Sequence, residues 1–109
     1  MSEITETRRT LKAAVEPLLR EGETVTVSAA PSTYEAGLST LGFNVTVTIG
    51  DAALDTTAER LDELLEPEGG IRAALQETGA AVTKTSGYRA YQGPDGPVLG
   101  AEWTAHILT

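Results

Sequence analysis

Apolar and polar residues alternate along the C-terminal part of the chain. The apolar positions are Leu99, Ala101, Trp103, Ala105 and Ile107, and the positions between them are Gly100, Glu102, Thr104, His106 and Leu108. A period of two is typical of a strand with one buried face. Because the only Trp of the chain lies on the apolar side, we expect this strand, together with the run before the turn at residues 93–97, to form the centre of the core.

Three further extended segments follow from the same alternation. They cover residues 23–29, 43–49 and 81–91, and Gly87 in the last of them favours a bulge or a close backbone approach. The polar positions of these strands predict one polar, nearly uncharged sheet face: Thr24, Thr26, Ser28, Asn44, Thr46, Thr48, Glu102, Thr104 and His106. Such a face lies against solvent, or against a channel or another subunit, and the pattern leaves both open.

Apolar residues at helical spacing predict three helices. The first covers about residues 3–20, with Pro17 weakening its last turn. The second begins at Asp51 or at Thr56, which has capping-box spacing to Glu59, and ends before Pro67. The third is a short piece over residues 71–77, which needs packing to be stable.

Residues 30–42 show no clean period and are predicted to form a loop. The apolar side chains of this loop either fold back on the core or contact a neighbouring subunit. The turn at residues 93–97 is stiffened by two prolines and is a candidate docking element. Together these segments provide the candidate interface residues Tyr34, Leu38, Leu41, Pro94, Asp95 and Pro97.

The order of these elements predicts an α+β fold. Strands arrive in consecutive pairs, which favours an antiparallel sheet. We expect a single domain over residues 1–109: a two-layer sandwich with a four-stranded antiparallel sheet and the helices on one face.

The residues that carry chemistry are scarce. The chain has no Cys and one His, which excludes disulfides, thiol catalysis and metal sites rich in Cys or His. The serines have no evident base except His106, which we expect to be an exposed strand residue on the polar face. No glycine-rich segment has the form of a phosphate loop. We therefore expect no catalytic residue, no cofactor and no metal. Because the first ten residues are polar and charged and no apolar run is long enough, we also expect neither a signal peptide nor a membrane span.

The chain is acidic, with a formal net charge of -8. Arg8 and Arg9 are the only adjacent basic pair, and Glu6 and Lys12 dilute it into an ordinary helix surface. The acidity is explained by solubility or by a surface that repels nucleic acid, and the sequence does not choose between these interpretations.

Several segments of the C-terminal half resemble a known family. They are Glu59–Leu65 (ERLDELL), Glu66–Gly70 (EPEGG), Ile71–Leu75 (IRAAL), Tyr88–Tyr91 and Leu99–Thr104 (LGAEWT). In this order they resemble the tail terminator proteins of long-tailed, siphovirus-type phages, in the version found in phages and prophages of actinobacteria. The resemblance covers residues 51–108, and its motifs are packing motifs without diagnostic chemistry.

The resemblance implies a structural virion protein with a small α+β fold. Such a protein assembles as a homohexameric ring that caps the tail tube, ends its polymerisation and joins it to the connector or stopper protein of the neck. DNA passes through the ring without specific binding, and the protein belongs to the virion tail or neck after assembly in the host cytoplasm. The alternatives are another ring protein of the neck or, in a different class, a small ligand-binding or regulatory α+β domain.

Overall fold

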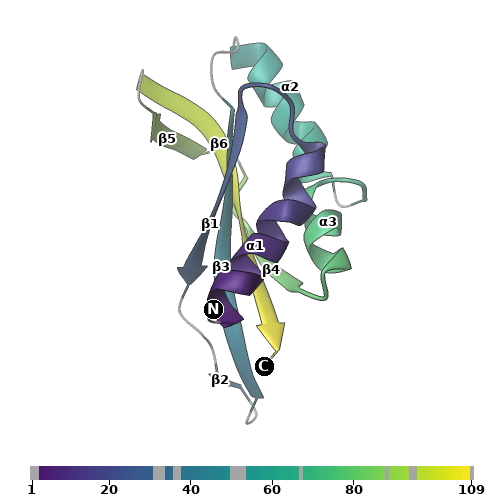
Figure 1. Ribbon diagram of the computed structural model, residues 1–109. Coiled ribbons are helices and arrows are strands. Elements are labelled where there is room, and N and C mark those ends of the chain that lie inside the picture. The colour runs from purple at the N-terminus through teal and green to yellow at the C-terminus, as the bar shows by residue number, and fades with distance from the viewer. Residues whose placement is uncertain are drawn as a thin grey trace.

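The computed structural model describes residues 3–30, 34–35, 38–49, 54–66, 68–87, 89–93 and 96–108. In chain order the elements are α1 (Glu3–Val15), the 3-10 helix η1 (Glu16–Leu18), β1 (Glu23–Ala30), β2 (Tyr34–Glu35), β3 (Leu38–Ile49), α2 (Leu54–Leu65), α3 (Ile71–Glu77), β4 (Ala81–Thr85), β5 (Arg89–Gly93) and β6 (Gly96–Leu108). Figure 1 shows the long strands running side by side with the three α-helices gathered on one side of them.

The sheet is antiparallel and follows the order β1-β3-β6-β4. The short β2 pairs with the beginning of β3, and β5 pairs with the beginning of β6. In the register of the central strands, Val45 on β3 lies between Val27 on β1 and Trp103 on β6. The two longest strands therefore form the middle of the sheet, as the alternation in their sequences requires.

The helices cover one face of the sheet and form the second layer. α1 packs on β1 and β3, α2 contacts β6, and α3 contacts β4 and α1. This arrangement confirms the predicted α+β fold, with its antiparallel sheet and its helices on one face. The sheet has more strands than the four predicted, because β2 and β5 also pair with its central strands.

The core between the layers is built mainly from aliphatic side chains. Its buried members are Leu11, Val15, Val25, Val27, Phe43, Val45, Val47, Ile49, Leu61, Leu64, Ile71, Leu75, Ala80, Ala101, Trp103 and Ala105. Trp103 is 1% exposed and is the largest of them. The prediction that the last strand supplies the centre of the core is confirmed. The run before the turn was expected to share this role, but β5 (Arg89–Gly93) contributes none of these buried side chains among the described residues.

The predicted loop over residues 30–42 is wrong at both of its ends. β1 includes Ala30, and β3 begins at Leu38 rather than at residue 43. Thr40 and Leu41 pair with Leu108 and Ile107 of β6, and Gly42 is buried opposite His106. Ladder pairing with a long neighbouring strand thus overrides the weak local strand propensity of this glycine-containing segment.

The predicted third strand over residues 81–91 is interrupted. It forms β4 and β5, which both pair with β6. Between them, Ser86 takes over the pairing: its N–H donates to the Glu102 carbonyl at 2.8 Å, and its hydroxyl accepts from the Glu102 N–H at 2.9 Å. Gly87 follows with φ +75°, a backbone conformation that favours glycine. The irregularity predicted at Gly87 is therefore the break between β4 and β5.

The predicted helix ends shift for local reasons. α1 ends at Val15, and the following turn becomes the 3-10 helix η1 because Pro17 has no N–H to donate to an α-helical bond. α2 begins at Leu54, so Thr56 lies inside the helix and is not its N-cap. The competing start, Asp51, lies outside the described residues.

Candidate functional site

The predicted interface residues fall at two opposite ends of the sheet. Tyr34 lies in β2 and Leu38 begins β3, at the end where β6 finishes. Pro97 lies near the start of β6, at the other end, and Pro94 and Asp95 lie outside the described residues. Figure 1 shows β2 and β5 at opposite ends of the molecule, so the structure does not gather these residues into one site.

Leu41 belongs to the core rather than to a free surface. It pairs with Ile107, is partly buried and packs against the buried cluster. For this residue the structure favours folding back on the core over contact with a neighbouring subunit. The backbones of Tyr34 and Leu38 form a tight antiparallel hairpin through the pairs Tyr34–Ser39 and Glu35–Leu38.

Pro97 is exposed and pairs with Gln92 of β5. Within the described residues, β3 pairs with β6 from Leu99 onward, so the strand partner described for Pro97 is β5 alone. A residue without an N–H is tolerated at such a position, because no ladder bond to β3 is lost. Pro97 is thus an exposed, rigid residue at one end of the sheet.

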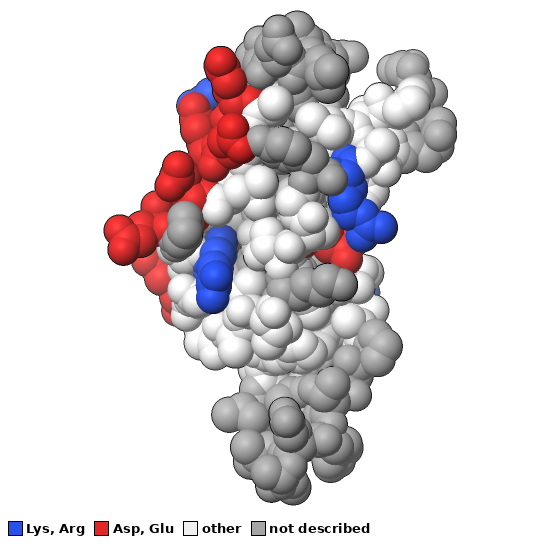
Figure 2. Space-filling view, turned by 180° about the vertical axis from the view of Figure 1, so that it is seen from behind, with Lys and Arg blue, Asp and Glu red and all other residues white. Residues whose placement is uncertain are grey.

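The sheet face opposite the helices is polar, as predicted. Thr24, Thr26 and Ser28 of β1 are exposed, and the facing positions of β3 and β6 are half-buried. Side chains link the central strands: Thr46 Oγ1 donates to Glu102 Oε2 at 3.5 Å, and Thr104 Oγ1 donates to Asn44 Oδ1 at 3.3 Å. Figure 2, seen from behind the helices, shows a largely uncharged area across this side, interrupted by a few charged side chains.

Glu102 and Tyr91 meet at one corner of this open face. Burial, and then the negative charge of Glu102, raise the pKa of the Tyr91 phenol above its ordinary value. The Tyr91 hydroxyl and His106 Nδ1 are buried without a hydrogen-bond partner within the described part of the chain. The guanidinium of Arg89 lies 6.0 Å from the centre of the Tyr91 ring. His106 lies on the polar face, as expected, but is half-buried.

The Tyr91 ring also explains the glycine of the LGAEWT segment. A Cβ at Gly100 would lie 3.0 Å from Tyr91 Cε2 and 2.4 Å from the Val47 carbonyl oxygen. The ring and the neighbouring strand therefore occupy the space that any other side chain would need. Gly100 is a packing requirement and carries no chemistry.

Acidic side chains gather along α2 and α3. The exposed members are Glu59, Asp62, Glu63, Glu66, Glu68 and Glu77. Figure 2 shows this acidic surface as a red band along the edge where Figure 1 places α2 and α3. The exposed acidic face of α2 therefore continues through Glu68 to α3.

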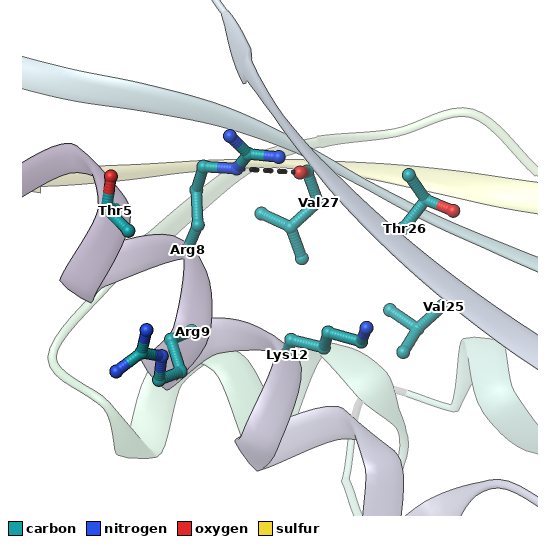
Figure 3. A pocket seen from close by; sticks show the side chains of 7 residues that line it. All are labelled: Thr5, Arg8, Arg9, Lys12, Val25, Thr26 and Val27. Carbon is teal, nitrogen blue, oxygen red and sulfur yellow. Dashed lines mark hydrogen bonds between the residues drawn. The ribbon is translucent and has the colours of Figure 1, made fainter.

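A groove lies between α1 and β1, which is the free edge strand on that side of the sheet. It has a volume of about 480 Å³ and is lined by Arg8, Arg9 and Lys12 together with Val25 and Val27. Figure 3 shows Arg8 and Lys12 extending from α1 toward β1, whereas Arg9 points away from the strand. Arg8 Nε donates to the Val27 carbonyl oxygen at 3.1 Å.

The sequence interpretation missed this groove. It treated Arg8 and Arg9 as a pair diluted by Glu6 and Lys12. The available signal was the four-residue spacing of Arg8 and Lys12, which places both on one helix face. The position of this helix face beside the edge strand β1 follows from the packing of α1 on the sheet, which the sequence pattern does not show.

A second charged cluster joins three elements on the helix side of the sheet. Arg60 Nε and Nη2 lie 2.7 and 2.9 Å from the two carboxylate oxygens of Glu23, and Arg60 Nη1 lies 2.9 Å from Glu63 Oε2. Arg60 also donates to the Leu18 carbonyl of η1. The side chains of Arg60 and Glu23 are 12% and 5% exposed, so this is a largely buried pair that ties α2 to the start of β1.

The pKa values of this pair move in opposite directions. Burial by itself raises the pKa of Glu23, but hydrogen bonds from Arg60 and the Arg20 N–H, together with both positive charges, lower it overall. The hydrogen bond to Glu23 raises the pKa of Arg60, against the opposing effect of burial. Both groups are therefore charged at neutral pH.

Neither a metal-binding cluster, nor a membrane-spanning helix, nor a known relative assigns a function to the part of the chain that the structure describes. Among the residues that the structure describes, no three His, Cys, Asp or Glu side chains are placed to hold a metal ion. No described helix is long and apolar enough to cross a membrane. The chain matches no protein-family model, and no curated protein matches it.

Proposed function

We propose that this chain is a ring-forming structural protein of a phage virion, a tail terminator that caps the tail tube and ends its polymerisation. In this proposal six copies form a ring, one side of which meets the tail tube protein and the other the connector or stopper of the neck. DNA passes through the ring without specific binding, and the chain has no enzymatic role.

The observation that carries the proposal is the placement of the candidate contacts. The molecule is elongated, with extents of 46 × 29 × 22 Å. The β2–β3 hairpin lies at one end of its long sheet and the exposed Pro97 at the other. A ring subunit between a tube and a neck needs separate docking elements on its two axial sides, and this arrangement offers them.

Three of the five segments that carry the family resemblance contribute to one core, which supports the proposal. Glu59–Leu65 belongs to α2, which contacts β6, the strand that holds Leu99–Thr104; Ile71–Leu75 belongs to α3, which contacts the neighbouring β4. Their buried members include Leu61, Leu75 and Trp103. These three segments are therefore packed together rather than scattered over the surface.

Assembly with tail tubes tests the proposal. Native mass spectrometry and negative-stain imaging of the purified chain, alone and mixed with tubes of the tail protein from the same genome, are expected to show rings and capped tube ends. Tubes polymerised in the presence of the chain should also stop growing. A strictly monomeric chain that neither forms rings nor binds tube ends would overturn the proposal.

A control separates the terminator from another ring protein of the neck. The same chain is mixed with isolated filled heads that carry a connector but no tail. Binding to tube ends in the absence of heads is expected of a terminator. Rings that bind heads but never tubes would assign the chain to the neck instead.

A further inference from the structure

The α1–β1 groove is cationic in a chain that is acidic overall. Three of the eight Lys and Arg residues line it, namely Arg8, Arg9 and Lys12. Its floor includes Val25 and Val27, which are each 5% exposed. A concave surface with an apolar floor and a cationic rim fits a partner surface that carries carboxylates.

We propose that this groove binds the acidic α2–α3 surface of a second copy of this chain. The inference rests on the proposed function, since it names the surfaces through which copies in a ring would meet. The acidic α2–α3 surface is complementary in charge to the groove. Its exposed carboxylates include Glu59, Glu66, Glu68 and Glu77. The two surfaces lie on different sides of the subunit, because β1 is at one edge of the view and α2 and α3 are at the other (Figure 1).

The hydrogen bond between Arg8 and the backbone of β1 indicates how the partner binds. The Val27 carbonyl oxygen of this edge strand accepts a hydrogen bond from Arg8 Nε at 3.1 Å. The Arg8 side chain therefore lies against the middle of β1, where it opposes edge-to-edge pairing with an added strand. A guanidinium has five N–H donors, and Arg8 can therefore hold this carbonyl and a carboxylate at the same time. Side-chain ion pairs, rather than a continued sheet, are the contact that this edge accepts.

The contact joins two different surfaces, so it is a heterologous one. Each copy that uses its groove leaves its own acidic surface open for the next copy. Heterologous contacts produce rings when the rotation between copies closes and open filaments when it does not. Charge complementarity of this kind also excludes the like pairings, groove to groove and acidic surface to acidic surface.

Nucleic acid is the competing occupant of a groove lined by cations. A phosphate-binding surface gains from every neighbouring positive charge and loses from every neighbouring negative one. With a net charge of -8, this chain repels a polyanion at long range, whereas a carboxylate surface of limited size contacts only the groove. The charges of the whole chain therefore favour the second copy.

The test uses charge reversal on both surfaces of the full chain. Lys12→Glu reverses the groove, and Glu66→Lys reverses the acidic surface. Arg89→Glu and Glu21→Lys are matched controls, because they change the net charge equally at exposed positions outside both surfaces. Circular dichroism confirms folding, and sedimentation at 50 mM NaCl measures the concentration at which each variant assembles.

Each reversal is expected to raise that concentration by about tenfold or more, while the controls stay near the wild type. An equimolar mixture of Lys12→Glu and Glu66→Lys should assemble again, because alternating copies restore opposite charges at every contact. Raising NaCl to 500 mM should weaken the wild-type assembly and not the Lys12→Glu variant.

The outcomes separate this inference from the proposed function. If the wild type assembles and Lys12→Glu behaves like Arg89→Glu, or if the mixture fails to recover, the inference is wrong, and the proposed function is unaffected. If Lys12→Glu abolishes binding of a fluorescent DNA duplex and leaves assembly unchanged, the groove is a nucleic-acid site. Assembly through these surfaces without binding to tubes would overturn the proposed function alone, and a wild type that stays monomeric even with tubes would overturn both.

Discussion

At the scale of single residues, the buried centre of the sheet depends on one large side chain and one absent side chain. Trp103 fills the core on the helix side of β6, and Gly100 leaves room on the other side of the same strand for the Tyr91 ring. Both belong to the LGAEWT segment. The segment is therefore explained by packing on two faces of one strand.

Replacing Trp103 with Ala is expected to lower the free energy of unfolding by about 3–5 kcal/mol, because the cavity left by a side chain that is 1% exposed cannot close. Urea unfolding followed by circular dichroism measures this loss. Thr104→Ala, on the half-buried open face of the same strand, is the control and should cost about 1 kcal/mol or less. A loss below about 1 kcal/mol for Trp103→Ala would contradict the assigned facing of β6.

Gly100→Ala is expected to destabilise the protein by about 1–3 kcal/mol, because the added methyl group meets the Val47 carbonyl and the Tyr91 ring. The double variant Gly100→Ala with Tyr91→Ala removes only the contact with the ring. Its loss should therefore be smaller than the sum of the two single losses, which urea unfolding of all three variants tests. Full additivity would show that the ring does not cover Gly100.

At the scale of elements, the Arg60–Glu23 pair is the polar link between the helix layer and the sheet. It connects α2 to the first residue of β1, and Arg60 also holds the Leu18 carbonyl of η1. The pair joins segments that are 37 residues apart in sequence. Arg60 thereby holds the end of η1 and the start of β1 next to α2.

Arg60→Met is expected to cost about 3–5 kcal/mol at neutral pH, because it leaves the Glu23 carboxylate buried without its partner. Arg20→Met is the control, since the ion pair that Arg20 forms with Glu63 is exposed and its loss should change stability by about 1 kcal/mol or less. Chemical unfolding at pH 7 compares the two. Equal small losses would mean that the Arg60–Glu23 pair is dispensable.

The pH dependence of this pair has a defined sign. The pKa of Glu23 in the folded protein is lowered from its ordinary value of 4.5, so the folded state binds a proton less readily than the unfolded state does. The stabilisation is therefore fully present above pH 4.5 and is lost as the pH falls below it, through the folded pKa. The stability difference between the wild type and Glu23→Gln should shrink between pH 6 and pH 3 in urea unfolding. A constant difference would contradict the lowered pKa.

At the scale of the whole molecule, charge and candidate contacts are distributed unevenly around an elongated subunit. The cationic groove and the acidic α2–α3 surface lie on different sides, and the hairpin of β2 and β3 lies at the end opposite to Pro97. Lateral and axial contacts of the proposed ring therefore use different parts of the chain. This separation allows them to be changed independently.

Pro97→Lys tests that independence. Because Pro97 is exposed, the substitution is expected to change the free energy of unfolding by about 0.5 kcal/mol or less. Under the proposed function it should weaken binding of the ring to one axial partner, tube or neck, and leave self-assembly unchanged. Sedimentation and tube-binding assays measure the two properties. Loss of self-assembly would instead place Pro97 in a lateral contact.

The sequence by itself determined the facing of the strands and the layer arrangement. Alternation along residues 43–49 and 99–107 correctly assigned Val45, Val47, Ala101 and Trp103 to the core, because a strand in a two-layer fold has one side to bury. It likewise assigned Thr46 and Thr104 to the open face. Those assignments depend only on periodicity, which is a local property.

Only the tertiary structure decided where strands begin and which charges meet. β3 extends back to Leu38 because β6 offers it a partner, and the local pattern around Gly42 does not reveal its partner His106, which is 64 residues away in the sequence. The Arg60–Glu23 ion pair and the hydrogen bond from Arg8 to β1 likewise join residues that are far apart in the sequence. Contacts between distant segments depend on the packing of helices on the sheet, which no local pattern encodes.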